Sequence, residues 1–479
     1  MRRQMAVLVA AAAACLAGAT APAGAATLFT VTGHGYGHGI GLGQYGALGY
    51  AQHGWDWPRI VLHYYPGTVL GQAPSALVAG ERVLLESSMP AFDFAAGVRI
   101  TIRDAGGGLS AATALQPGSY TLQPGLTAGR WRIVDAVTGL PVLKNLVGPV
   151  DVSPWGRPLQ ILDTMPLGWA GGHWWGWFRV APNAAGTALS LVEDVPMETY
   201  LRGVVPSEMP SSWLPQALAA QAVVARSYAY ATQHPSGAWD VVDGVGEAYG
   251  PVEHWSSATD AAVAATAGQV VLYRGAAATT FYSSSSGGLT DSEVGAWDCS
   301  GCGTPYLQPV VDPYDSAGGN PNHSWRMTPQ TPAAIARELG FSRPVVALSP
   351  VIGSRSRRVL RLDVVMAGGG TATVDGYAAQ QLLGLRSTYF RIAGVTLTGP
   401  ASVPAGHLAV LSGSVWPLPR GAVALQRRIG TGPWVTRIAA LRISADGSFR
   451  VTTHPTGIWS YRLVPPGGAA SPVVTVAVG

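Results

Sequence analysis

The residue best placed for chemistry is one carboxyl group, Glu208, in the run Val-Pro-Ser-Glu-Met-Pro at positions 205–210. Pro206 and Pro210 fix the backbone on either side and push the residues before them towards extended geometry, which predicts a tight turn. Apolar neighbours raise the pKa of such a carboxyl, whereas the dipole of a following helix lowers it. Glu208 is therefore a candidate general acid or base, with helix capping as its alternative role.

A long helix should follow this turn directly. Ser211 or Ser212 is suited to cap its N-terminus, and Pro215 is tolerated in a first helical turn. The run from residue 216 is rich in Ala, Leu and Gln, with a stripe of small and apolar residues on one face. We expect this helix to hold the Glu208 turn in place.

A second group of polar side chains lies in the glycine-rich stretch 33–47. Glycine permits positive φ and a close approach of the backbone to a ligand. The stretch can then present side chains that hydrogen-bond to a sugar or stack on it, namely His34, His38, Gln44 and Tyr45. A metal site at the two histidines is disfavoured because no carboxylate stands beside them. The dinucleotide-like glycine spacing at 41–46 lacks the βαβ unit that nucleotide binding needs.

Two of the three cysteines, Cys299 and Cys302, form a C-x-x-C pair, and the third lies near the N-terminus. In an exported protein a local disulfide or a pair of free thiols is the first interpretation. Zinc is the rival, but it needs two further ligands and no histidine neighbours these cysteines in the sequence. We therefore expect no cofactor, with zinc at this pair as the less favoured alternative.

The composition indicates an exported, loop-rich protein. Only 12% of the 479 residues are charged, and the net charge of +4 is spread along the chain without a nucleic-acid footprint. Residues 1–25 have the basic start, apolar centre and Ala-x-Ala end of a signal peptide. No later stretch is long and apolar enough for a membrane helix. We expect a secreted or wall-associated protein whose mature chain, after removal of the signal peptide, starts near Ala26.

The two segments around Glu208, 204–210 (VVPSEMP) and 217–229 (ALAAQAVVARSYA), resemble the SpoIID/LytB family of bacterial cell-wall proteins. Members with an assigned activity are lytic transglycosylases, or act as partners of peptidoglycan amidases. The resemblance places the family's catalytic glutamate at Glu208. It places the arginine of the second motif at Arg226, as a residue that orients Glu208 or contacts substrate.

The same family carries a glycine-histidine block, which residues 38–47 and 63–68 (HYYPGT) match. In most relatives this block closes the catalytic domain at its C-terminus. Here it comes first, as though the domain were circularly permuted, so it should fold back beside Glu208. The resemblance also implies substrate contacts from Tyr228 and from Ser285 in a serine-rich loop.

One departure from the family concerns residues 239–250. Relatives often show a Cys-Gln-Val-Tyr-Gly pattern here, whereas this chain lacks that Cys and that Gln and has Glu247 instead. The difference puts in doubt any family metal site or disulfide at this place.

For the fold, we expect an α+β catalytic domain of SpoIID type at 155–393, completed by 26–70. A β-rich N-terminal insertion should occupy 80–154, and an all-β immunoglobulin-like sandwich 394–479, since both have short alternating segments between turn residues. One cluster of tryptophans is expected mainly in the core, with stacking on sugars as the alternative: Trp155, Trp169, Trp174, Trp175 and Trp177.

The resemblance implies a peptidoglycan lytic transglycosylase in which Glu208 protonates the glycosidic oxygen and then accepts a proton from the C6 hydroxyl. One carboxyl suffices because the substrate supplies the nucleophile, whereas a hydrolase normally needs two. Two alternatives stay open. One is a non-catalytic, glycan-binding activator of a cell-wall amidase. The other is a muramidase whose second carboxyl is Asp194, Glu198 or Asp240.

Overall fold

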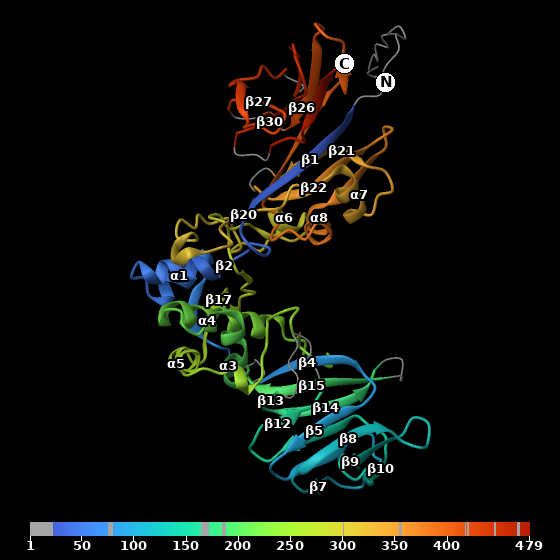
Figure 1. Ribbon diagram of the computed structural model, residues 1–479. Coiled ribbons are helices and arrows are strands. Elements are labelled where there is room, and N and C mark those ends of the chain that lie inside the picture. Colours follow the sequence, from blue (N-terminus) through green and yellow to red (C-terminus); the bar gives the residue numbers. More distant parts are fainter. Residues whose placement is uncertain are drawn as a thin grey trace, which may run out of the picture. The chain divides into compact units, whose positions relative to one another are not determined.

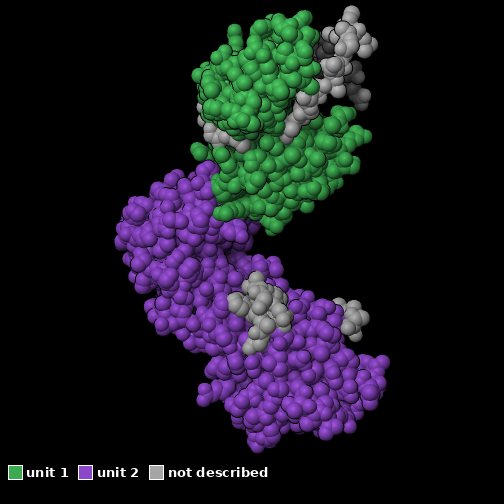
Figure 2. All heavy atoms as spheres, viewed as in Figure 1, with its two compact units in different colours: residues 1–33, 325–353, 357–479 green, residues 34–324, 354–356 purple. Residues whose placement is uncertain are grey.

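The computed structural model describes residues 23–479 except 75–79, 164–171, 184–187, 300, 354–356, 417, 419–420, 445–446 and 467–469, with side chains from residue 28 onwards. The expected signal peptide therefore lies almost entirely outside the described residues. Two compact units make up the chain. One comprises residues 34–324, and the other comprises 23–33, 325–353 and 357–479 (Figure 2).

Five helices form the centre of the unit at 34–324 (Figure 1): α1 (Gln44–Gln52), α2 (Trp57–Tyr64), α3 (Met197–Glu208), α4 (Pro215–Thr232) and α5 (Ser257–Ala265). Helix α4 contacts all four others, because its many alanines let neighbouring backbones approach closely. Pro215 opens α4 as predicted. The predicted serine cap is wrong: Leu214 occupies the N-cap position, and no side chain bonds there.

The N-terminal block is built into the same core as segments more than 190 residues later. Strand β2 (Leu42–Gly43) pairs in parallel with β19 (Tyr282–Ser283). Strand β3 (Val69–Gln72) pairs antiparallel with β17 (Gln269–Tyr273), whose other neighbour is β18 (Ala276–Ala277). These ladders fix α1 and α2 against α4, and with them the glycine-rich stretch.

Two antiparallel sheets account for most of the segment 80–196. Alternation of buried and less buried residues along their strands gives each sheet an apolar face. The seven-stranded sheet has the order β16 (Val241–Val242), β4 (Gly80–Met89), β15 (Leu189–Pro196), β14 (Trp177–Pro182), β11 (Val150–Pro154), β6 (Ile100–Asp104) and β7 (Thr113–Leu115), with β16 parallel to β4. The six-stranded sheet has the order β10 (Pro141–Leu146), β9 (Trp131–Asp135), β8 (Gly118–Pro124), β5 (Phe92–Ala96), β12 (Leu159–Ile161) and β13 (His173–Trp174).

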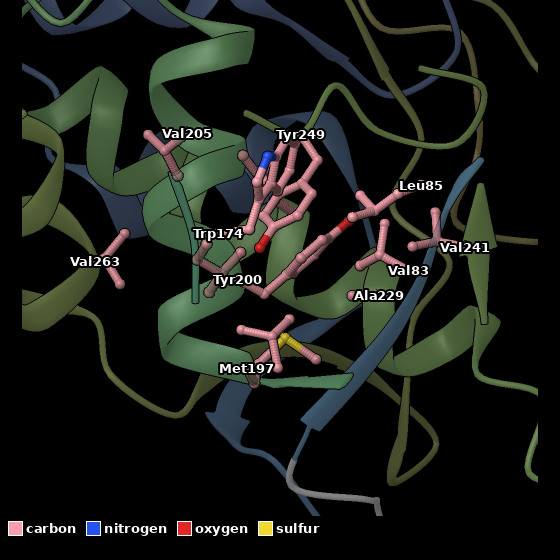
Figure 3. Close-up of a cluster of buried hydrophobic side chains, with 14 of the residues drawn as sticks. Val83, Leu85, Trp174, Met197, Tyr200, Val205, Ala229, Val241, Tyr249 and Val263 are labelled. Atoms are coloured by element: carbon pink, nitrogen blue, oxygen red, sulfur yellow. The ribbon is translucent and has the colours of Figure 1, made fainter. Parts of the chain in front are cut away.

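Aromatic rings join the sheets to the helices. Figure 3 shows Trp174 beside Tyr200 of α3 and Tyr249, and the ring of Tyr249 lies 5.3 Å from that of Trp174 and 5.0 Å from that of Tyr200. All three side chains are buried. Strand β15 passes directly into α3, so this core fixes the helix that carries Glu208.

The tryptophan cluster is only partly in the core. Trp174 is 1% exposed, as the core interpretation requires, but Trp155 and Trp177 are 65% and 66% exposed, which contradicts it. Trp177 points outwards because residues alternate between the two faces of β14, and its neighbour Phe178 takes the buried position. Trp169 lies outside the described residues.

The other unit contains two five-stranded sheets. One has the order β20 (Ser324–Arg326), β1 (Ala23–His34), β24 (Phe390–Gly399), β26 (Ala409–Trp416) and β29 (Ser448–Thr453). The second has the order β25 (Ser402–Val403), β31 (Val474–Val478), β30 (Trp459–Val464), β27 (Ala424–Ile429) and β28 (Val435–Ile438). The immunoglobulin-like character of residues 394–479 stays a prediction.

A smaller core in that unit packs a three-stranded sheet against two helices and β1. Its elements are β21 (Val345–Ile352), β22 (Val359–Met366), β23 (Thr371–Asp375), α7 (Pro332–Glu338) and α8 (Gly376–Leu382). Among its described residues, the unit at 34–324 also has α6 (Glu293–Trp297) and the 3-10 turns η2 (Val252–His254) and η3 (Ala317–Gly319).

Candidate active site

Glu208 is the last residue of α3, not part of a turn that precedes a helix. The helix continues through Pro206 and ends because Met209, which precedes Pro210, is extended (φ −128°, ψ 139°). The prediction of a turn is therefore wrong at Pro206 and right only at Pro210. The expected effect of a helix dipole on Glu208 is reversed as well. Glu208 lies at the C-terminal, negative end of its own helix, which opposes a carboxylate.

Neutral donors bind the Glu208 carboxyl. Gln44 Nε2 donates to Oε2 at 2.9 Å, and the backbone N–H of Ala248 donates to Oε1 at 2.8 Å. Among the described residues Glu208 forms no salt bridge. Burial raises the pKa of Glu208, and the hydrogen bonds from Ala248, Gln44 and Tyr282 oppose that rise without cancelling it. The site favours a carboxyl that holds its proton.

Gln44 reaches Glu208 from the N-terminal block. Strand β2 ends at Gly43 and α1 begins at Gln44, so the pairing of β2 with β19 sets the position of this amide. Gln44 Nε2 also lies 3.5 Å from Gln221 Oε1 on α4. The glycine-rich stretch thus lies beside Glu208, as the resemblance implied.

A second carboxyl group, Glu247, lies next to this site. Tyr200 donates to its Oε2 at 2.8 Å and Tyr282 donates to its Oε1 at 2.9 Å. Glu247 is 2% exposed, and this burial raises its pKa to about 8 against the opposing effect of the two phenol bonds; the charge of Glu208 adds to the rise. At neutral pH the Glu247 carboxyl is therefore mainly protonated.

Sequence reasoning did not assign a role to Glu247, although it noted this residue at a departure from the family pattern. It also missed Tyr200 and Tyr282. A buried phenol is indistinguishable from a core aromatic in the sequence, and only the departure at Glu247 gave a signal. Since the backbone N–H of the next residue, Ala248, binds Glu208, the two carboxyls belong to one site.

Arg226 does not lie where the resemblance implied. Its side chain is fully buried, and its Nε and a terminal nitrogen donate to Glu198 at 2.9 and 2.6 Å. Another terminal nitrogen donates to the Gln269 carbonyl oxygen at 3.0 Å. Arg226 therefore ties α4 to the first turn of α3 and to β17. It is not exposed to a substrate, because the surrounding core encloses its charge.

Two of the three alternative second carboxyls have ion-pair partners, and the third lies near the other end of α3 from Glu208. Glu198 pairs with Arg226, and Asp240 accepts hydrogen bonds from Arg82 at 2.7 and 2.9 Å. Asp194 lies opposite Trp177 across strands β15 and β14. The carboxyl that accompanies Glu208 is Glu247, so the structure contradicts the choice of those three for a two-carboxyl mechanism.

Three other predicted residues keep part of their surface exposed. His34 is exposed and its Nδ1 lies 3.1 Å from the His323 carbonyl oxygen. The ring of Tyr45 packs edge-on against Trp213 at 4.9 Å, and that of Tyr228 lies 5.7 Å from Phe281.

The other two are held by the surrounding loops. His38 Nδ1 accepts a hydrogen bond from the Ile40 N–H at 3.0 Å, and its ring lies 5.6 Å from Trp297. Ser285 is fully buried and its hydroxyl donates to Asp315 at 2.9 Å, so it is a structural residue of the serine loop and not an exposed substrate contact.

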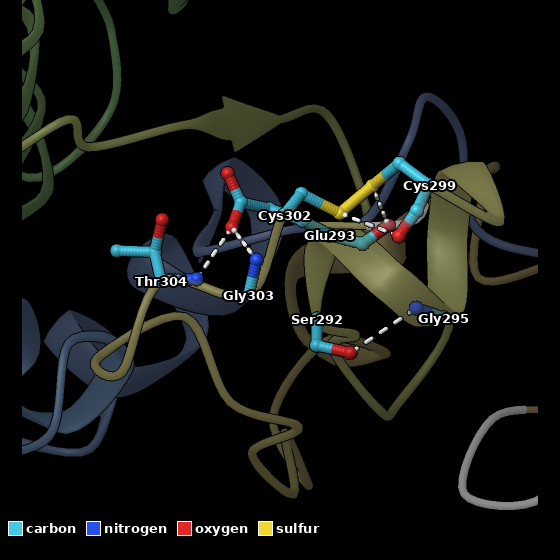
Figure 4. The surroundings of a disulfide bond; sticks show 7 residues. All are labelled: Ser292, Glu293, Gly295, Cys299, Cys302, Gly303 and Thr304. Carbon is cyan, nitrogen blue, oxygen red and sulfur yellow. Dashed lines mark hydrogen bonds between the residues drawn. A yellow bond between two sulfur atoms is a disulfide. The ribbon is translucent and has the colours of Figure 1, made fainter.

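Cys299 and Cys302 are joined by a disulfide, with their Cα atoms 5.8 Å apart (Figure 4). Beside it, Glu293 accepts hydrogen bonds from the backbone N–H groups of Gly303 and Thr304, at 3.1 and 2.7 Å. In this state neither cysteine offers the thiolate that zinc needs. Over the described part of the chain, no group of three or more His, Cys, Asp or Glu side chains is arranged to hold a metal ion.

Part of this chain is similar to proteins named for sporulation and for amidase enhancement. Residues 185–273 match the family model described as SpoIID, stage II sporulation protein. The amidase enhancer of Bacillus subtilis (strain 168) is 35% identical over 148 residues, which are 30% of this chain and 19% of that protein. Stage II sporulation protein D of the same strain is 28% identical over 222 residues, which are 43% of this chain and 62% of that protein.

An uncharacterized protein of Brachyspira hyodysenteriae (strain ATCC 49526 / WA1) is 33% identical over 124 residues, 24% of this chain and 32% of that protein. This chain thus spans less than two thirds of each of these relatives. No solved structure matches it. Among the described residues, every helix is too short or too polar to cross a membrane.

Proposed function

This chain carries a SpoIID domain at residues 185–273, and from that premise we propose that it is a peptidoglycan lytic transglycosylase that works outside the cell membrane with Glu208 as its acid and base. The observation that carries the proposal is the state of Glu208. It is a carboxyl whose pKa is raised by burial and whose hydrogen-bond partners are all neutral. A raised pKa shifts this carboxyl towards the protonated form that a general acid needs.

In the proposed reaction, protonated Glu208 donates to the glycosidic oxygen that follows N-acetylmuramic acid, and the bond from C1 to that oxygen breaks. The C6 hydroxyl of the same sugar attacks C1 and gives its proton to Glu208. A 1,6-anhydro end forms, and Glu208 regains its starting state. The N–H of Ala248 and the amide of Gln44 stabilise the carboxylate between the two proton transfers.

Glu247 favours the lyase over a two-carboxyl hydrolase. A hydrolase needs an ionised second carboxylate as a nucleophile or as the base for a water. Glu247 is buried, bound by two phenols and mainly protonated at neutral pH. In that state it can donate its own proton to the Tyr282 oxygen, which frees the Tyr282 proton for Glu208. We assign Glu247 to positioning Tyr282 and Glu208, and not to attack on the sugar.

A second candidate function is activation of a cell-wall amidase, without catalysis. The relative named amidase enhancer favours it, since it matches this chain at 35% identity. An activator would bind glycan at the same site, and its function would tolerate the loss of the Glu208 proton.

Mass spectrometry of glycan strands, with and without stem peptides, separates these functions. Strands are incubated with the wild-type protein and with Glu208→Gln. Anhydro-muramyl products from the wild type alone support the lyase, whereas products heavier by one water indicate a hydrolase. Intact strands in both incubations, with glycan binding preserved, support the activator.

A further inference from the structure

The seven-stranded sheet carries a pocket that the proposed reaction does not use. Its volume is about 440 Å³, within the size range of small-molecule sites. Its lining includes Trp175, Trp177, Arg157 and Asp194, which together define what we call the tryptophan pocket. Trp155 lies between two further lining residues, Pro154 and Gly156.

Trp177, which lines the pocket, and Trp155, which lies between two lining residues, are both exposed to solvent. Trp177 and Trp155 are 66% and 65% exposed. Trp177 is fixed by the ladder between β14 and β15, and Trp155 is fixed by a hydrogen bond of 2.7 Å from its Nε1 to Thr101 Oγ1. Large apolar rings that a rigid scaffold keeps in water are typical of binding surfaces.

Polar groups accompany the rings. Asp194 stands directly opposite Trp177 in the antiparallel pair, so both side chains lie on the same face of the sheet. The Arg157 side chain is exposed and forms no ion pair with another described residue. An indole face, a carboxylate and a guanidinium suit the C–H face, the hydroxyls and the acyl oxygen of an N-acetylated sugar.

Two lining glycines allow close backbone packing beside Asp194. A Cβ atom at Gly176, between the two lining tryptophans, would lie 2.6 Å from the Asp194 carbonyl oxygen. A Cβ atom at Gly80 would lie 3.3 Å from Asp194 Oδ1. Any other residue at these positions would crowd the Asp194 backbone or its carboxyl group.

The pocket lies at the opposite end of α3 from Glu208. Pro196 lines it and is also the N-cap residue of α3, and Glu208 is the twelfth and last residue of that helix. Twelve residues of α-helix span about 18 Å. Between the two ends, the Trp175 ring lies 6.4 Å from that of Trp255, and Trp255 packs at 3.8 Å against Arg202 of α3. Two tryptophan rings thus lead from the pocket to Arg202, the sixth residue of the helix.

We propose that the tryptophan pocket is a second glycan-binding site, which holds sugar rings of a strand about 18 Å from Glu208. The identity of the ligand rests on the proposed function. A strand bound at both places gains affinity because its second contact is intramolecular. The pocket therefore favours long strands over short ones.

Binding is tested on the full chain with Glu208→Gln, so that cleavage does not interfere. The probe is peptide-free glycan strands, measured by isothermal titration calorimetry. The double variant Trp155→Ala, Trp177→Ala should bind long strands about tenfold more weakly, a loss of the size expected for two stacked rings. Its thermal unfolding should match the parent, since both rings are exposed. The matched control is Trp416→Ala in the other unit, whose ring is 37% exposed.

Equal affinity of the double variant and its parent for long strands overturns the proposal, as does an equal loss in the Trp416 control. Unchanged glycan binding with lost stimulation of a cell-wall amidase also overturns it, in favour of a protein partner. Failure of the lyase itself is separate, because it shows as intact strands with wild-type protein while the binding difference persists. If the lyase is active, the double variant should cleave short strands at the wild-type rate and long strands more slowly.

Discussion

Helix α3 carries a glutamate near each end, and the two have opposite environments. Glu198 lies in the first turn, where the helix dipole favours a carboxylate, and the buried Arg226 and the Gly268 N–H bind it. Glu208 lies at the last residue, where the dipole opposes a carboxylate, and only neutral groups bind it. One residue type on one helix therefore serves structure at one end and is suited to proton transfer at the other.

The difference between the two ends lies in the charge of the groups that bind each carboxyl. A full positive charge compensates Glu198 and holds the helices together. Glu208 has hydrogen bonds without a counter-charge, so its neutral form is favoured and its pKa is raised. Raised carboxyl pKa values of this kind concentrate at functional sites. The groups that bind a carboxyl therefore indicate whether it serves structure or proton transfer.

The largest expected effect comes from Glu208→Gln. The amide keeps the shape and can accept the Ala248 hydrogen bond, but it has no proton to transfer. We expect glycan cleavage to fall by about 10²–10⁴-fold, the usual contribution of a general acid, with unfolding temperature unchanged or raised. Anhydro-muramyl product formation measures this. The matched variant Glu198→Gln should cleave at nearly the wild-type rate, and equal losses in the two would break the comparison.

Arg226→Met should chiefly reduce stability. It removes a buried cation whose partner Glu198 is 44% exposed, and it leaves the Gln269 carbonyl without that hydrogen bond, so we expect the free energy of unfolding to fall by about 1–3 kcal/mol. Urea unfolding of the soluble variant measures it. If the variant does not accumulate, Arg226→Lys, which keeps the charge and loses the bidentate geometry, should show a smaller fall. A stable Arg226→Met protein that has lost only cleavage would instead assign Arg226 to the reaction.

Glu247→Gln tests whether the Glu247 carboxyl is protonated, because its effect on stability should depend on pH. The folded-state pKa of Glu247 is about 8, above its usual value of 4.5, so between these pH values the folded protein holds a proton that the unfolded chain has released. This makes the wild type lose stability as pH rises through that window. The amide removes that contribution. The free energy of unfolding of the variant minus that of the wild type should therefore be larger at pH 8 than at pH 5.

Unfolding by urea at the two pH values measures this difference. A stability difference that does not change with pH would contradict a protonated Glu247. In glycan cleavage, Glu247→Gln should stay active, because its amide can still donate to Tyr282 and accept from Tyr200, and only the pH profile should shift. Glu247→Ala, which has neither group, should lose most of the activity.

The smallest effect is expected from Arg202→Ala. Arg202 pairs with Asp260 at 2.6 Å, but their side chains are 39% and 29% exposed. Water screens this pair, so its loss should cost about 1 kcal/mol or less and should diminish in high salt. Urea unfolding at two salt concentrations measures it. If Arg202→Ala lowers the free energy of unfolding as much as Arg226→Met does, burial does not explain the difference expected between the two arginines.

The sequence by itself determined the local elements around the site. Pro215 and the alanine-rich run after it specified α4, Pro210 specified the end of α3, and alternation specified the strands of the insertion. The motif resemblance singled out Glu208 and brought the N-terminal block to its side, where Gln44 lies. These conclusions rest on local rules and motif likeness, which a linear sequence contains.

Only the tertiary structure decided the partners. In the structure Arg226 pairs with Glu198. The Glu247 carboxyl lies beside Glu208, and Tyr282 contacts both. Trp177 is exposed to water, whereas Trp174 is buried. Gln44 and Glu208 are 164 positions apart, and Arg82 and Asp240 are 158 apart. No local pattern specifies such pairs, because they depend on how helices and sheets pack around a shared core. Packing also sets burial, and burial sets which carboxyl holds a proton.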